Sequence, residues 1–400
     1  MRGGLRWMVL ALCCALVAAC GTRAASEQAW KEPQLRTKAD FRASDHDPDR
    51  GAIAKEAREW VERGTLPGAG TRWESMSRWA LIDIRQMLVS GRAAGGAPPA
   101  GAAPSWGYFW PRDGAFLAVA LDRTGHHEDA AHLVDILAGL PFDDVAGFDA
   151  RYLLGGTRVE INPRGPQSDG CGWVLWALGS MAASSLPPST AGLRSKCLTN
   201  LLRLTWSGWQ LPPPSPDYWE LPVEETTLGT VAPMLAGLLA VARSGTTQER
   251  SQAATMAKRL ATQIHSELGP GLQRFGDHGG LDAAVAMMMP PFGPSDRRVT
   301  KQWLGYQRAA IRSSGGLAPG AAWRNDGTSW TPETALVAYT AAASGRDKVA
   351  ARWLDWLDAH RTSWGSLPEK VNRSGNPAGP APLLWTSTLV LLTLDALEEQ

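Results

Sequence analysis

Glu220 is the residue whose neighbours most favour acid–base chemistry. It follows Trp219 in the stretch "SPDYWELPVEET", with Glu224 and Glu225 close behind. A carboxyl packed against an indole loses hydration, and nearby carboxylates repel its charge, so both effects favour the protonated form that can act as an acid. The alternative is a cluster of acidic residues at a helix start. It explains the two later glutamates better than Glu220, because Pro222 comes between them.

A second stretch, "WGYFWPRDGAF", places aromatic surface beside a charged pair where a helical pattern begins. Arg112 is a planar donor fork and Asp113 is an acceptor, so side by side they can hold adjacent hydroxyls of one sugar ring. Trp110 or Trp106 can then cover an apolar face of that ring. The alternative is an Arg–Asp ion pair that pins a loop, with the indoles as packing.

Glu369 stands in a third stretch, "SLPEKVNRSGNPAGPAPLLW", between a proline and Lys370. Taken alone, a loop glutamate of this kind is expected to be solvated. An exposed ion pair with Lys370 would add little stability.

The whole chain limits the classes of function. It has 400 residues and a formal net charge of +1, and no basic stretch stands out, so we expect no nucleic-acid partner. The histidines lack metal-ligand spacing and no phosphate-binding glycine motif occurs, so we expect no metal and no cofactor. Tryptophan is abundant, with 19 copies against 5 Tyr and 7 Phe. Indoles can form platforms for sugar rings or fill a helical core, and composition leaves both open.

The N-terminus reads as an export signal. A positively charged start precedes the apolar run Trp7 to Val17, which is too short to remain as a membrane span. The following "VAAC" resembles a bacterial lipobox, which implies that Cys20 carries a lipid; a plain secretory signal cut nearby is the alternative. We therefore expect a lipoprotein signal peptide over residues 1–20, a tether over 21–50, and a monomer on the outer face of the cell membrane, or secreted.

Two cysteines, Cys171 and Cys197, lie beyond this segment. Outside the cytoplasm such a pair can oxidise to a disulfide. Two buried free thiols are the alternative, because the sequence does not give the distance between them.

Amphipathic helix is the dominant pattern after residue 50. Apolar residues recur at three and four positions, while strand-like alternation is scarce. We predict about a dozen helices, over residues 52–63, 73–89, 115–122, 128–138, 172–183, 191–204, 226–242, 248–268, 282–289, 297–313, 332–344, 348–360 and 383–397. Long loops rich in Gly, Pro and Trp recur after roughly every second helix, which suits helical hairpins in a ring. We expect one folded domain over residues 51–400.

Four stretches together resemble one enzyme family. In order and in rough spacing, "WGYFWPRDGAF", "PQSDGCGWVLWAL", "DYWEL" and "LPEKV...SGNPAG..PLLW" are similar to the catalytic domain of glycoside hydrolase family 15, the glucoamylase-like enzymes. The resemblance covers about Trp73 to Leu397. It implies an all-α (α/α)6 barrel with an active-site pocket at one end, in agreement with the helix count and the loop grouping.

The resemblance also implies roles for individual residues. Glu220 matches the general acid that protonates the glycosidic oxygen, and Glu369 matches the general base that activates a water on the opposite face of the ring. Arg112 and Asp113 match the pair that grips hydroxyls of the terminal glucose. The other residues expected at the substrate pocket are Trp110, Asp169, Trp219, Tyr108, Trp173 and Trp330. Inverting hydrolysis needs the two carboxyls roughly 6.5–9.5 Å apart.

The sequence departs from many relatives at the site for the next sugar along. Leu221 stands where a second glutamate follows the acid in those relatives, and the arginine expected ahead of "SWTPE" has only Arg312 and Arg324 as candidates. These departures do not favour long-chain starch. Short α-glucosides with isomaltose-type or trehalose-type linkages, or an envelope glycan, fit as well.

We therefore predict an exo-acting, inverting hydrolase that releases glucose from the non-reducing end of α-glucosides. A catalytically inactive, carbohydrate-binding envelope lipoprotein on the same barrel is the alternative, suggested by the missing second glutamate. A lyase or phosphorylase on this barrel is a third and weaker reading.

Overall fold

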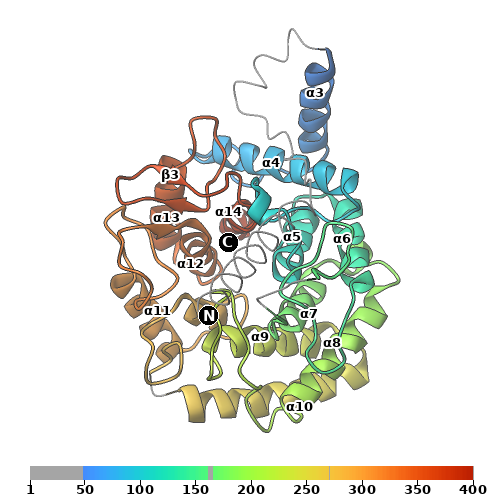
Figure 1. Ribbon diagram of the computed structural model, residues 1–400, viewed down its shortest axis with the longest axis vertical. Coiled ribbons are helices and arrows are strands. Elements are labelled where there is room, and N and C mark those ends of the chain that lie inside the picture. Colours follow the sequence, from blue (N-terminus) through green and yellow to red (C-terminus); the bar gives the residue numbers. More distant parts are fainter. Residues whose placement is uncertain (1–47, 161–164, 270, 400) are drawn as a thin grey trace, which may run out of the picture.

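A computed structural model describes residues 48–160, 165–269 and 271–399 (Figure 1). The expected signal peptide with Cys20, and nearly all of the expected tether, lie outside these ranges. Within them, no helix combines the length and the apolar character needed to cross a bilayer.

Six helical segments of the described chain form an inner ring. They are α5 (Pro111–Arg123), α7 (Gly170–Ser180), α9 (Leu228–Ser244), the short 3-10 helix η5 (Ala283–Met288), α12 (Thr331–Ala342) and α14 (Leu384–Glu398). Each packs against the next, and α14 closes the ring on α5. Every residue of α12 is buried, including Glu333 and three threonines.

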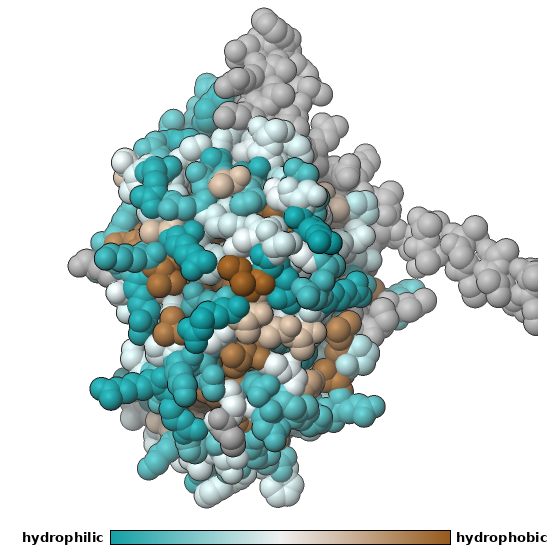
Figure 2. Space-filling model, turned by 90° about the vertical axis from the view of Figure 1, so that its left-hand side faces the viewer, coloured by the Kyte–Doolittle hydropathy of each residue, from teal (hydrophilic) through white to brown (hydrophobic). Residues whose placement is uncertain are grey.

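The outer ring surrounds these helices and meets solvent on one side. It consists of α4 (Glu74–Ala93), α6 (His127–Gly139), α8 (Thr190–Leu204), α10 (Thr247–Gln263), α11 (Arg297–Ala309) and α13 (Asp347–Ala359), with α3 (Pro48–Arg63) packed on α4. Each outer helix packs on an inner one, from α6 on α5 round to α4 on α14. Hydrophilic residues predominate on the side shown in Figure 2. The predicted (α/α)6 barrel is confirmed.

The helices α7 and α9 approach each other closely because two glycines face the contact. A Cβ atom on Gly172 would lie 2.4 Å from the carbonyl oxygen of Pro233, and one on Gly237 would lie 2.5 Å from the carbonyl oxygen of Gly172. Any larger side chain would push the two backbones apart. These glycines cost helix stability in isolation but permit the tight inner ring.

Two predicted helices differ in the structure. The segment predicted at 282–289 is a 3-10 helix, capped by the Asp282 side chain and ended just before Pro290 and Pro291, which cannot continue it. The segment predicted at 248–268 divides into α10 and a π-helical turn, Ile264–Leu268.

Three very short strands form a sheet that the sequence did not indicate. The strands β1 (Ser329–Trp330), β2 (Lys370–Val371) and β3 (Pro377–Ala378) pair antiparallel in that order. Two-residue strands show no alternating pattern, so sequence periodicity cannot reveal them. The sheet matters because β2 begins directly after Glu369.

Candidate active site

A pocket of about 430 Å³ opens where the inner helices α5, α12 and α14 begin. Its lining comes from the first turns of these three helices and from the loops that lead into them and into α9. The predicted residues that line it are Glu220, Glu369, Trp110, Arg112, Asp113, Trp219 and Trp330. The fold therefore brings together residues from four separate stretches of the chain.

Arg112 and Asp113 enter the pocket from the first turn of α5. Pro111 occupies the first helical position, where its missing N–H costs nothing, so the next two side chains are fixed at the helix start. Both are buried, and Nη2 of Arg112 lies 3.0 Å from Oδ2 of Asp113. Burial raises the pKa of Asp113, the arginine opposes this, and the charge of Glu220 raises it further.

Hydrogen-bond donors without partners surround this pocket. Among the described residues, Nε and Nη1 of Arg112 and the indole Nε1 atoms of Trp219, Trp330 and Trp385 are buried without a hydrogen-bond acceptor, and all four residues line the pocket. Buried donors are nearly always satisfied in folded proteins. Unused hydrogen-bonding capacity is therefore concentrated in the residues around this one cavity.

Indoles also form one wall of the pocket. Trp219 meets Trp323 edge to face with ring centroids 4.7 Å apart, and Trp323 meets Trp330 in the same way at 5.5 Å. The guanidinium of Arg112 lies 4.7 Å from the ring of Trp385 on another side. Rigid aromatic faces of this kind suit the apolar faces of sugar rings.

Glu220 lies in the connection between α8 and α9, with a backbone conformation that non-glycine residues rarely adopt. Its φ is +56°, which costs roughly 1–2 kcal/mol for an L-residue. Its N–H donates to the carbonyl of Asp217 at 2.7 Å, and Trp110 donates its indole N–H to Oε1 of Glu220 at 2.5 Å. Strained residues persist where the surroundings determine them, and they concentrate at functional sites.

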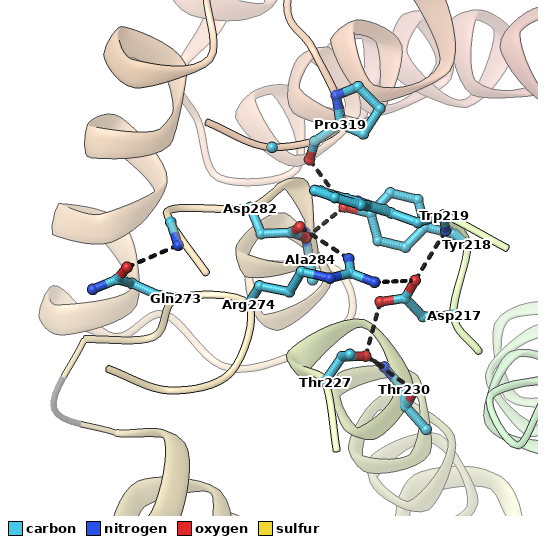
Figure 3. A network of polar contacts seen from close by, with 12 residues as sticks. Asp217, Tyr218, Trp219, Thr227, Thr230, Gln273, Arg274, Asp282, Ala284 and Pro319 are labelled. Atoms are coloured by element: carbon cyan, nitrogen blue, oxygen red, sulfur yellow. Dashed lines mark hydrogen bonds and ion pairs between the residues drawn. The ribbon is translucent and has the colours of Figure 1, made fainter. Parts of the chain in front are cut away.

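A buried network holds the connection that carries Glu220 (Figure 3). Asp217 accepts hydrogen bonds from Nη2 of Arg274 at 2.8 Å, from the Trp219 N–H at 2.9 Å and from Oγ1 of Thr227 at 2.8 Å. The guanidinium of Arg274 also lies 3.8 Å from the ring of Trp219. These contacts therefore fix the backbone just before Glu220.

The same arginine links this network to η5. Nη1 of Arg274 lies 3.3 Å from Oδ2 of Asp282, and the Tyr218 hydroxyl donates to the other oxygen of Asp282 and contacts the Pro319 carbonyl at 3.0 Å. Burial raises the pKa of Asp282 to about 6, although Arg274 opposes the shift. A single cation thus serves two buried carboxyl groups.

Glu369 is held by backbone pairing on both sides. Its N–H donates to the Pro380 carbonyl at 2.9 Å, and its own carbonyl accepts from the Thr331 N–H at 3.0 Å. The side chain is 7% exposed, with Oε2 at 3.1 Å from Nζ of Lys370. The expectation of a solvated loop glutamate is therefore wrong. Gly379 makes room for this carboxyl, because a Cβ there would lie 2.5 Å from Oε2.

The electrostatics of Glu369 reflect three contributions. Burial raises its pKa, the ammonium of Lys370 lowers it, and the charge of Glu220 raises it. The pKa of Glu369 therefore responds to the charge of Glu220, which lines the same pocket.

Three expected residues do not line the pocket. Trp173 is completely buried in an aromatic core with Phe116 and Trp176. Asp169 precedes α7, accepts a 3.2 Å hydrogen bond from Nε1 of Trp173, and lies near Arg112, whose charge opposes the burial that raises the pKa of Asp169 to about 7. Tyr108 is half-buried and stacks against the guanidinium of Arg151 at 4.0 Å.

Glu333 also lines the pocket, although the sequence analysis did not predict it as a site residue. It lies in the first turn of α12, is 4% exposed, and its Oε2 has no hydrogen-bond partner among the described residues. Burial, reinforced by the charge of Glu369, raises the pKa of Glu333 to about 8. This shift favours the protonated form of the Glu333 carboxyl at neutral pH. The "SWTPE" segment gave a signal, since its proline sets a helix start just as Pro111 does.

The two candidate arginines have different places. Arg324 lines the pocket. Nη2 of Arg312 donates to the carbonyls of Gly320 at 3.2 Å and Trp323 at 3.1 Å, so this side chain supports the loop instead.

The two cysteines lie side by side away from the pocket. The Sγ atoms of Cys171 in α7 and Cys197 in α8 are 2.6 Å apart, and both are buried as free thiols. A disulfide stays a prediction. In the described part of the chain, no group of three or more His, Cys, Asp or Glu side chains could hold a metal ion.

Comparison with known proteins gives one curated relative and many similar structures, while no family model matches. The isomaltose glucohydrolase of Kribbella flavida is 27% identical over 350 residues, which is 76% of this chain and 89% of that protein. A wild-type glycosidase structure has a TM-score of 0.67 at 24% identity, covering 81% of this chain and 97% of its own.

Glucoamylases share the fold at lower identity. That of Saccharomycopsis fibuligera has a TM-score of 0.61 at 15% identity, covering 76% of this chain and 89% of its own. A bacterial glucoamylase complexed with acarbose has a TM-score of 0.64 at 13% identity, covering 85% of this chain and 57% of its own. The sequence similarity and the shared fold together make this chain a glycoside hydrolase of the glucoamylase-like fold.

Proposed function

We propose that this glycoside hydrolase is an exo-acting, inverting enzyme of family 15 that releases glucose from the non-reducing end of α-glucosides. The observation that carries the proposal is the shared pocket. Two carboxyls from distant loops, Glu220 and Glu369, face one cavity in which the donors of Arg112 and three indoles lack acceptors. A sugar ring supplies the missing acceptors.

In the proposed mechanism Glu220 is the general acid. Its carboxyl gives a proton to the glycosidic oxygen as the bond to the anomeric carbon breaks. The indole N–H of Trp110 on Oε1 fixes the orientation of this carboxyl. The left-handed backbone at Glu220 directs the side chain into the cavity.

Glu369 is the general base. Its ionised carboxylate takes a proton from a water molecule, which attacks the anomeric carbon from the face opposite the leaving group. The adjacent ammonium of Lys370 favours the ionised form of this carboxyl and partly offsets its burial. Because attack and departure occur on opposite faces, the product is β-glucose.

The proposed substrates are short α-glucosides, with α-1,6-linked isomaltose first. The sequence relative named isomaltose glucohydrolase motivates this choice. The side chain of Leu221, which is 44% exposed beside the acid, offers no hydrogen bond to a second sugar. We further propose a monomeric protein that is exported and anchored through a lipid on Cys20.

A panel of glucobioses tests the proposal. The wild-type protein is incubated with α-1,4-, α-1,6-, α-1,3- and α,α-1,1-linked disaccharides, and glucose release is measured for each. Glucose from the α-1,6 compound at the highest kcat/KM supports the proposed substrate. No release from any of the four, by a protein with a cooperative melting transition, would favour the inactive sugar-binding alternative.

A further inference from the structure

Two tryptophans outside the pocket are exposed to solvent. Trp206 is 71% exposed and Trp209 is 62% exposed, in the connection that follows α8. Tryptophan is highly buried on average in folded proteins, and the other described indoles of this chain are far more enclosed. The same connection, residues 205–227, also carries Glu220.

The backbone fixes the two indoles in this exposed position. Three consecutive residues, Trp206, Ser207 and Gly208, have positive φ values of 47°, 59° and 85°. The Gly208 N–H donates to Oγ1 of Thr205 at 3.0 Å, and a Cβ on Gly208 would lie 2.6 Å from the carbonyl oxygen of Met256 in α10. The turn is therefore seated tightly on α10, in a conformation that non-glycine residues adopt only at a cost.

A groove continues from this turn, and its lining combines apolar surface, including Leu202 and Met256, with polar side chains. Arg259 of α10 stacks on Trp209 at 4.3 Å from the ring centroid, and its Nη1 lies 3.5 Å from the carbonyl of Ser207. Both Arg259 and Ser207 also line the groove, together with side chains that carry hydroxyl and amide groups, such as Gln248, Ser251 and Thr255. Among its lining residues, all within the described range 165–269, Arg259 is the one charged side chain.

We propose that Trp206, Trp209 and the adjoining groove on α10 form an accessory binding site for an α-glucan chain, separate from the catalytic pocket. Flat indole faces cover the apolar faces of sugar rings, and neutral hydroxyl and amide groups match sugar hydroxyls. An anionic membrane surface would be met by a cluster of basic residues, and this site has one arginine. The choice of α-linked glucose as the repeating unit rests on the proposed function, which assigns short α-glucosides to the catalytic pocket. Binding of a longer chain belongs to this accessory site alone.

The site is tested by native gel electrophoresis in gels that contain dextran or amylopectin. The parent protein carries Glu220→Gln, so that the polysaccharide is not digested during the run. We expect one or both polysaccharides to retard the parent protein. The double change Trp206→Ala with Trp209→Ala is expected to raise the apparent dissociation constant about tenfold or more. Trp209→Phe keeps an aromatic face and retains most of the retardation.

Matched controls separate binding from folding and from catalysis. Val145 is 68% exposed, and Val145→Ala leaves the retardation unchanged. All variants have the melting temperature of the parent, and in the active background the double variant hydrolyses isomaltose at the wild-type rate. If retardation persists while the wild-type protein hydrolyses no glucobiose, the proposed function fails and the accessory site stands.

Three outcomes would overturn the site. The parent runs unretarded in both gels, or the double variant is retarded as strongly as the parent. Alternatively, the parent binds phosphatidylglycerol vesicles through the two indoles and ignores both polysaccharides, which would identify a membrane-contacting surface instead.

Discussion

The indole N–H of Trp110 donates a 2.5 Å hydrogen bond to Oε1 of Glu220, across a sequence separation of 110 residues. This contact joins the loop before α5 to the loop before α9. It places the residue just before Arg112 and Asp113, the proposed sugar-binding pair, in contact with the proposed acid. A single hydrogen bond therefore links the two parts of the proposed site.

Trp110→Phe removes this hydrogen bond and keeps most of the aromatic surface. Glu220 becomes charged as it gives up its proton, and a hydrogen bond to a charged group contributes about 1.5–3 kcal/mol, so we predict that kcat on isomaltose falls about 10–100-fold. Hydrolysis of α-glucosyl fluoride, whose leaving group needs no proton, falls much less. Equal losses on the two substrates would show that the indole acts in binding and not on the acid.

Lys370→Met tests whether Lys370 controls the pKa of Glu369, the proposed base. Burial already raises the pKa of Glu369, and Lys370 opposes that shift. Since the base acts when ionised, activity falls as the pH drops through this pKa. Removing the ammonium raises the pKa of Glu369 further, so we predict that the acidic limb of kcat moves to higher pH. A kcat–pH profile checks this, with the exposed Lys258→Met as control. An unmoved limb would remove Glu369 from the role of base.

Glu333→Gln distinguishes a neutral acid from a carboxylate in the pocket. The pKa of Glu333 is raised to about 8 in the folded state, above its value in the unfolded chain. Its contribution to stability is therefore present at pH values below about 4.5 and is lost as the pH rises towards 8. Glutamine stays neutral, so the melting temperature of the variant exceeds that of the wild type increasingly between pH 5 and pH 8. A constant difference would show that Glu333 is ionised throughout.

Arg274→Met tests the support beneath the acid. The change leaves Asp217 and Asp282 buried without their shared cation. Breaking a buried ion pair from one side costs about 3–5 kcal/mol, so we predict a free energy of unfolding lower by that amount, measured by urea denaturation. Arg308→Met, at an exposed position of α11, changes it by less than about 0.5 kcal/mol. Equal effects of the two changes would deny the network its structural role.

The sequence predicted the elements whose signals are local. Helices of both rings follow from apolar periodicity, and the start of α5 follows from the proline of "WPRDG". The same local signal at Pro332 would have pointed to Glu333. Leu221 and Arg324 also lie at the pocket, and the motifs beside them in the sequence had marked both positions.

Other features depend on contacts between distant residues. The burial of Glu369 results from pairing with Thr331 and Pro380 and from the space left by Gly379, none of which has a periodic signal. The Asp217–Arg274 ion pair joins residues 57 positions apart. Trp173 was expected near the substrate because of its motif, but α7 turns that side chain into the core. A sequence pattern shows whether a helix face is apolar or polar, but it does not show which element packs against that face.

The stereochemistry of the first product tests the inverting mechanism most directly. Isomaltose is hydrolysed by the wild-type protein in an NMR tube, and the anomeric proton of the released glucose is followed before mutarotation equilibrates it. Glu220 and Glu369 acting as acid and base around a single water molecule give β-glucose as the initial product, and Glu369→Gln gives none. Initial release of α-glucose would contradict this mechanism, because it would require a covalent intermediate in place of the water.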